Sequence, residues 1–181
     1  MQSFLKFKNL TNLKIVACAA FFAAISIVFG KFLAFNVGET LRFSFESLPI
    51  ILCGIAYGPT VAALTGLVAD LVGCLLRGYA INPIITLACL LIGFLAGVLS
   101  FVLRHTNKSL MLFITVFVCH IIGSIIIKTI GLHLVLGYPF FITLIQRTIN
   151  YLVVAIVEYM ALVSLFRNKP FLRTIGVKYE L

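Results

Sequence analysis

The chain has 181 residues, of which 62% are hydrophobic and only 10% are charged. In soluble domains about a quarter of the residues are charged. The composition therefore excludes an ordinary soluble protein and predicts a single integral membrane domain over residues 1–181. The net charge of +9 is high enough for nucleic-acid binding, but the basic residues form no patch interleaved with aromatic residues, so an excess of cytoplasmic Lys and Arg explains it better.

Six apolar segments predict an all-α protein, a bundle of six transmembrane helices. Their approximate ranges are 13–35, 47–57, 60–76, 84–103, 110–130 and 140–166. The first segment follows several lysines, as a secretory signal would. At about 20 residues it is long enough to span a bilayer, and its only small-x-small site stands at its start, so we expect it to be retained as a helix.

The second segment is unusually short. Its 11 or so residues cover only about 16 Å as a helix, roughly half of the hydrocarbon core. Either it borrows part of the preceding polar stretch, or it does not span the bilayer alone. Short helices are tolerated where they line a cavity, which places a candidate cavity beside the stretch with Glu39, Arg42 and Glu46.

The distribution of charge predicts the orientation. With six spans, both termini and the loops after the second and fourth segments share one side of the membrane. That side collects nine of the 14 Lys and Arg residues. Cytoplasmic loops are enriched in Lys and Arg, so both termini are predicted to be cytoplasmic. A five-helix arrangement would scatter these residues over both sides.

The other five cations flank or interrupt apolar segments: Lys31, Arg42, Arg77, Lys128 and Arg147. Charge at membrane depth is costly and usually faces a cavity or a partner. All five fall in the predicted outer half. Arg42, Arg77 and Arg147 are therefore interpreted as a carboxylate-binding set around an outward cavity, with Lys128 as a candidate fourth member. Lys31 is interpreted as an anchor that reaches the headgroups.

The remaining ionisable residues give weaker signals. Gly66, Asp70 and Arg77 share one helix side, so Asp70 makes either a contact between helices or a contact with substrate. Glu158 lies in the inner half of the sixth segment without an assigned partner, and His120 is interpreted as a packed core residue. The five cysteines lie at least fifteen positions apart, so neither a metal site nor a redox pair is predicted.

Small residues recur in the first segment. Ala19/Ala23 and Ala20/Ala24 have the spacing that lets helix backbones approach closely in lipid. Gly93 and Gly97 make a similar pair in the fourth segment. The spacing fits either packing within the protein or docking of a partner helix.

Several separate blocks together resemble the substrate-binding S component of an energy-coupling factor (ECF) vitamin transporter, with the folate family as the nearest group. The blocks are LRFSF at 41–45 with Leu48-Pro49, YGP at 57–59 followed by Gly66 and Asp70, GYAINP at 78–83, KTIGL at 128–132, and QR at 146–147 with NYL at 150–152. They occur in the right order and cover nearly the whole chain.

The resemblance implies a multi-pass protein of a bacterial cell membrane that binds a vitamin and is not an enzyme. The first and third inter-helix loops would close over an outward site. Small residues of the first helix, which match Ala19, Ala20, Ala23 and Ala24, would dock against a membrane scaffold subunit driven by two cytoplasmic ATPases. The chain has no GxxxxGK[ST] motif, so it cannot energise transport alone. No cofactor is expected.

A folate-like ligand would match the chemistry of the outer residues. Its carboxylates require Arg or Lys, its pterin edge could donate to Glu39 or Glu46, and aromatic rings could stack on its flat parts. The predicted substrate-binding residues are Glu39, Arg42, Phe45, Glu46, Arg77, Tyr79, Asn82, Lys128, His133, Tyr138, Arg147 and Asn150.

Two different functions also fit the sequence. The ligand could be another vitamin, with thiamin, riboflavin or a queuosine precursor as the main options. An intramembrane lipid-modifying enzyme is the candidate of a different class, but the sequence has no HExxH spacing and no recognisable catalytic constellation.

Overall fold

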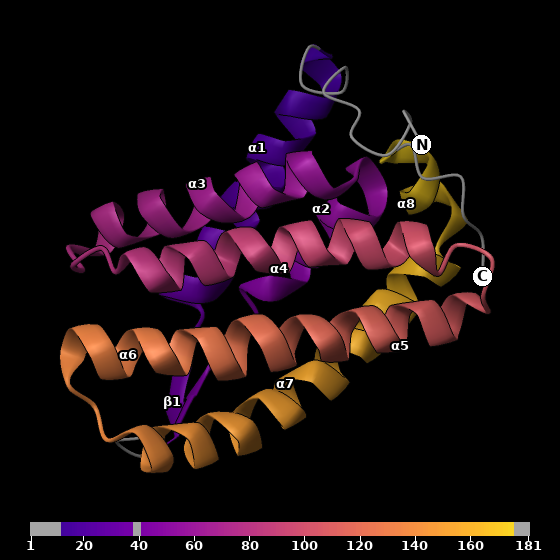
Figure 1. The fold of residues 1–181 in the computed structure, drawn as a ribbon. Helices are drawn as coiled ribbons and strands as arrows, with labels where there is room; N and C mark the ends of the chain where they lie inside the picture. Colours follow the sequence, from indigo (N-terminus) through magenta and orange to yellow (C-terminus); the bar gives the residue numbers. More distant parts are fainter. Residues whose placement is uncertain (1–11, 38–40, 176–181) are drawn as a thin grey trace.

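The computed structural model describes residues 12–37 and 41–175, which form helices apart from two short strands (Figure 1). The predicted all-α fold class is confirmed. The elements in chain order are α1 (Leu13–Ile27), the π-helix η2 (Val28–Phe32), β1 (Phe35–Val37), β2 (Leu41–Phe43), α2 (Ser47–Tyr57), α3 (Pro59–Arg77), α4 (Pro83–Val102), α5 (Lys108–Cys119), the π-helix η3 (His120–Ile127), α6 (Lys128–Leu136), α7 (Phe140–Arg167) and α8 (Lys169–Thr174).

Five helices of the described chain are long and apolar enough to cross a bilayer. They are Leu13–Phe32, Pro59–Arg77, Pro83–Val102, Lys108–Leu136 and Phe140–Arg167. The sixth, α2, has only 11 residues and lies in the core, where Ile50, Ile51, Leu52 and Cys53 are buried. A helix that is apolar all round is stable when neighbouring elements surround it, which explains how this short segment is accommodated.

Two boundaries differ from the expected segments. The first helix ends with η2 at Phe32, and Phe35 lies in β1, which pairs with β2 in an antiparallel hairpin. The α5–η3–α6 helix continues past residue 130 to Leu136. It ends there because Gly137 adopts the left-handed conformation at φ 70°, the usual helix C-cap, and Pro139 follows.

Helices α2, α3 and α4 approach one another closely through glycines. A Cβ atom at Gly93 would lie 2.2 Å from the Ala62 carbonyl oxygen, and one at Gly66 would lie 2.3 Å from the Cys89 carbonyl oxygen. Gly97 is equally tight against Pro59, at 2.3 Å from its backbone nitrogen. The Gly93/Gly97 spacing seen in the sequence therefore serves packing within the protein.

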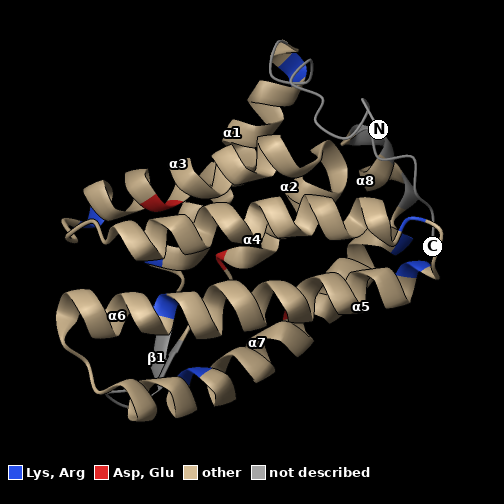
Figure 2. Ribbon diagram, in the orientation of Figure 1, with Lys and Arg blue, Asp and Glu red and all other residues tan. Residues whose placement is uncertain are grey.

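Several basic residues at the ends of the spans, or between two spans, lie at one end of the helices. Figure 2 shows them where α4 turns into α5 and where α7 ends, which corresponds to Arg104, Lys108 and Arg167. The α3–α4 and α6–α7 turns lie at the opposite end (Figure 1). This arrangement fits the orientation derived from the charges, which stays a prediction.

Gly93→Ala should destabilise the protein, because the added methyl group meets backbone atoms of α3 that cannot move aside independently. We expect a loss of about 1–3 kcal/mol, typical of overpacking. Thermal unfolding in detergent would measure it. Val102→Ala in the same helix is the control, because that side chain is exposed and its truncation should have little effect. Equal melting temperatures for the two variants would contradict the prediction.

Candidate functional site

A cavity of about 850 Å³ opens between η2, α3, α4, α6 and α7. Among the described residues, five charged side chains line it: Lys31, Glu46, Asp70, Lys128 and Arg147. The lining also includes the aromatic residues Tyr79, Tyr138 and Tyr151, together with amide groups and aliphatic side chains. This volume is within the range of sites that enclose small organic ligands.

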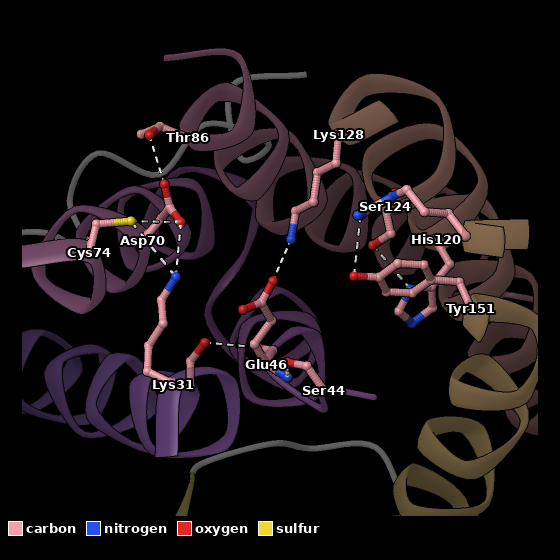
Figure 3. A network of polar contacts seen from close by, with 12 residues as sticks. Lys31, Ser44, Glu46, Asp70, Cys74, Thr86, His120, Ser124, Lys128 and Tyr151 are labelled. Carbon is pink, nitrogen blue, oxygen red and sulfur yellow. Dashed lines mark hydrogen bonds and ion pairs between the residues drawn. The ribbon is translucent and has the colours of Figure 1, made fainter. Parts of the chain in front are cut away.

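Lys128 and Glu46 form an ion pair across the cavity (Figure 3). Lys128 begins α6 and is only 4% exposed, whereas Glu46 immediately precedes α2. The Glu46 backbone is held by two serines: its carbonyl accepts from Ser26 Oγ at 2.7 Å, and its N–H donates to Ser44 Oγ at 3.4 Å. The absence of a side chain at Gly30 matters here, since a Cβ would lie 2.6 Å from Glu46 Oε2.

Lys31 and Asp70 form a second pair, which joins η2 to α3 (Figure 3). Their charged atoms are 3.7 Å apart, and Thr86 of α4 donates to the other Asp70 carboxylate oxygen at 2.7 Å. The Lys31 side chain is 11% exposed. The interpretation of Lys31 as a headgroup anchor is therefore wrong. Lys31 points inward because Asp70 on α3 supplies a counter-ion. Gly73 leaves room for it, since a Cβ there would lie 2.8 Å from Lys31 Cε.

Arg147 lies in α7 and points toward the η3 segment. Its Nε and Nη2 atoms donate to the Ser124 carbonyl oxygen at 2.9 and 2.7 Å, and its guanidinium stands 5.0 Å from the centre of the Tyr151 ring. Both contacts are with neutral groups. Within the described part of the chain, no carboxylate forms an ion pair with Arg147.

The remaining predicted residues that line the cavity differ in exposure. Asn82 is buried, caps α4 by accepting from Ile84 N at 3.1 Å, and donates to the Gly131 carbonyl at 2.8 Å. Asn150 is also buried in the lining, while the Tyr79 and Tyr138 side chains are about half exposed at its rim.

Other predicted residues lie elsewhere. Arg77, His133 and Phe45 do not line the cavity. Arg77 stacks on Phe32 and donates through Nε to the Lys31 carbonyl at 2.7 Å, whereas His133 contacts the Tyr138 carbonyl at 2.8 Å. Glu39 is outside the described residues, and for Arg42 the backbone alone is described, in β2. Of the predicted carboxylate-binding set, Arg147 lines the cavity, Arg77 does not, and the side chain of Arg42 is not described.

The family model for the ECF transporter, substrate-specific component, matches residues 14–170. The chain belongs to this family. Its members are the substrate-binding components of transporters and are membrane proteins, which agrees with the apolar helices and confirms the resemblance found in the sequence.

Three solved structures share the fold. The structure of FolT bound with folic acid aligns with a TM-score of 0.68 and 24% identity, covering 93% of this chain and 97% of FolT. ThiT from Listeria monocytogenes gives 0.67 and 21%, covering 90% and 97%. The S component for biotin from an ECF-type ABC transporter gives 0.61 and 17%, covering 90% and 96%.

A curated relative is 32% identical over 98 residues: the uncharacterized protein MG313 homolog of Mycoplasma pneumoniae. The alignment covers 54% of this S component and 34% of the relative. The chain therefore spans about a third of the length of that protein.

Three cavity features of this S component were not predicted from the sequence. Thr86 joins Asp70, Lys31 lies inside, and Tyr151 packs on Arg147. Tyr151 could have been found, because it is four residues after Arg147 and so on the same helix face. The contacts of Asp70 with Lys31 and Thr86 join segments that are far apart in sequence, so no short stretch of residues indicates them.

Glu46→Gln should destabilise this S component, because it leaves the buried Lys128 cation without its counter-ion. We expect a cost of about 3 kcal/mol. The double variant Glu46→Gln/Lys128→Met should recover most of the loss, since an apolar side chain needs no counter-ion. Thermal unfolding in detergent tests both, with Arg104→Met at the exposed α4–α5 turn as the control. A double variant no more stable than Glu46→Gln alone would show that the pair does not carry the effect.

Proposed function

We propose that this S component captures folate in the cavity and delivers it to a membrane scaffold subunit and two cytoplasmic ATPases in a bacterial cell membrane. The observation that carries the proposal is Arg147, a cation in the cavity lining whose described polar contacts are with neutral oxygens. Lys31 and Lys128 already face acids. An anionic ligand gains most by approaching Arg147.

The glutamate part of folate supplies suitable anions. A guanidinium can hold a carboxylate through two parallel hydrogen bonds, and such charge-assisted bonds are stronger than neutral ones. Gln146, Asn150 and Thr143 stand near Arg147 in sequence on α7 and line the same cavity. They offer further donors to the ligand.

The pterin part of folate needs flat surfaces and an acceptor for its amino-amidine edge. Tyr79 and Tyr138 at the rim offer aromatic faces, and Glu46 and Asp70 are carboxylates in the lining. FolT, with which this chain shares its fold, was solved with folic acid bound, and this supports folate over other vitamins.

A second candidate is another vitamin. ThiT and the biotin S component share the fold almost as closely, with TM-scores of 0.67 and 0.61. Arg147 has no acidic partner among the described residues, which disfavours a cation such as thiamin and suits an anion such as biotin. A competition panel with these two vitamins, riboflavin and a queuosine precursor would separate the candidates.

We infer that the scaffold subunit docks on one face of α1. This helix leans away from the bundle at its start (Figure 1), and 22% of its span is buried, against 56% for α3. Ala20 and Ala24 are exposed, whereas Ala23 is buried and Ala19 packs on the core. The docking prediction therefore rests on Ala20 and Ala24.

Purified protein should bind folic acid without ATP, and Arg147→Ala should weaken that binding about 10- to 100-fold, the value of a hydrogen-bonded charge contact. Equilibrium titration in detergent measures both. Arg104→Ala is the control, because Arg104 stacks on Phe101 at the far end of α4. If Arg147→Ala bound folic acid as tightly as Arg104→Ala, Arg147 would be removed from the site. If the wild type bound biotin or riboflavin instead, the vitamin would be reassigned.

Ala24→Leu should impair assembly with the scaffold subunit and leave ligand binding intact, because the larger side chain keeps the two helices apart. We expect at least a several-fold loss of co-purified scaffold and ATPase subunits from cells that express the whole transporter. Val153→Leu, on the exposed face of α7, is the control. Equal co-purification of both variants would place the docking face elsewhere.

A further inference from the structure

Five polar or aromatic side chains form a seam between η3 and α7: His120, Ser124, Arg147, Tyr151 and Glu158. We call it the η3–α7 seam; Figure 3 labels three of its residues, His120, Ser124 and Tyr151. Arg147 and Tyr151 line the cavity, and the other three do not. His120 is 2% exposed, and Ser124 and Glu158 are 0% exposed.

The contacts in the seam run from Arg147 into the interior and return to α7. Arg147 donates to the Ser124 carbonyl at 2.9 and 2.7 Å. The Ser124 hydroxyl is 3.2 Å from His120 Nδ1, and His120 Nε2 is 2.8 Å from Glu158 Oε2. The His120 ring also packs on the Tyr151 ring at 5.3 Å, and that ring in turn carries the Arg147 guanidinium.

The backbone of the seam is unusual as well. His120 and Ser124 both belong to η3, a π-helical stretch of eight residues within a longer α-helix. π-Helical turns are rare and occur frequently at functional sites. The Ser124 carbonyl that accepts from Arg147 therefore belongs to the π-helical segment. The side-chain contacts of His120 and Ser124 help to maintain the geometry of that segment.

Glu158 is a costly residue for a merely structural role. One of its carboxylate oxygens, Oε1, is buried and has no hydrogen-bond partner among the described residues. Burying a carboxylate destabilises a protein unless it is fully paired, and an apolar side chain of similar size would often be at least as stable. A cost of this kind at membrane depth points to function.

We propose that His120 and Glu158 are positioning residues that hold Arg147 in the geometry that receives the ligand. Glu158 holds the His120 ring in place. That ring contacts the Ser124 hydroxyl and packs on the Tyr151 ring. It thereby positions the two residues, Ser124 and Tyr151, whose carbonyl and ring contact Arg147. Ligand affinity then depends on two residues outside the cavity lining. This inference rests on the proposed function, in which an anionic group of the ligand binds Arg147.

Binding of folic acid to the purified full-length protein provides the first test. Glu158→Leu removes the acceptor of His120 and should weaken binding about tenfold, a typical size for coupled neighbours. Glu158→Gln keeps a carbonyl acceptor and should restore most of the affinity. Ser124→Ala removes the hydroxyl alone and should lose a smaller factor. Tyr159→Phe is the matched control, because it breaks a 2.6 Å hydrogen bond of α7 to Ser109 outside the seam.

A double-mutant cycle separates positioning from general destabilisation. In an Arg147→Lys background the guanidinium contacts with Ser124 are gone, so adding Glu158→Leu should change affinity less than about twofold. A loss of the same factor in both backgrounds would overturn the proposal. So would wild-type affinity in both Glu158→Leu and Ser124→Ala.

A measurement without ligand keeps this test distinct from that of the vitamin. The ¹H–¹⁵N NMR signal of the Arg147 Nε–H group, assigned with Arg147→Lys, should shift in Ser124→Ala and Glu158→Leu and stay in place in Tyr159→Phe. If wild-type protein fails to bind folic acid while these shifts appear, the choice of vitamin is wrong and the positioning stands. An Arg147 signal unmoved by Ser124→Ala would overturn the positioning even where folic acid binds.

Discussion

The structure depends on the pairing of positive charge inside an apolar bundle. A lysine cation withdrawn from water needs a counter-ion, and both cavity lysines have one: Glu46 faces Lys128, and Asp70 faces Lys31. Each pair joins elements that are distant in sequence. The first sets the start of α2 against the start of α6, and the second ties η2 to α3. The walls of the cavity are therefore held together by the same charges that line it.

Glycines make these pairs possible. A side chain at Gly30 would collide with Glu46, and one at Gly73 would collide with Lys31. Gly66, Gly93 and Gly97 let the backbones of α3 and α4 approach closely. The positions of the glycines thus determine both the spacing of α3 and α4 and the room for the two ion pairs of the cavity.

The sequence was sufficient to predict those features that depend on a short, continuous stretch of residues. Apolar length and charge placement were sufficient for the helical class, for the unusual α2, and for Arg147 as a cation in a cavity. The hairpin of β1 and β2 was missed because each strand has only three residues. The inward turn of Lys31 was missed because headgroup anchoring and ion pairing use the same side chain, and the choice depends on Asp70, which is far away in sequence. Likewise, Glu158 had no assigned partner, since His120 becomes its neighbour only when α5 and η3 pack on α7.

Arginine and lysine perform different tasks in this protein. Both cavity lysines are neutralised by carboxylates, whereas Arg77 and Arg147 donate to backbone carbonyls, those of Lys31 in η2 and Ser124 in η3. A planar guanidinium can place two donors on one neutral oxygen and keep its charge uncompensated, which a compact ammonium does less well. The two π-helical segments each present a carbonyl to an arginine of another helix. Among the described residues Arg147 is held by dipoles and by no acid, so the anionic ligand proposed above would bind it without first breaking an ion pair.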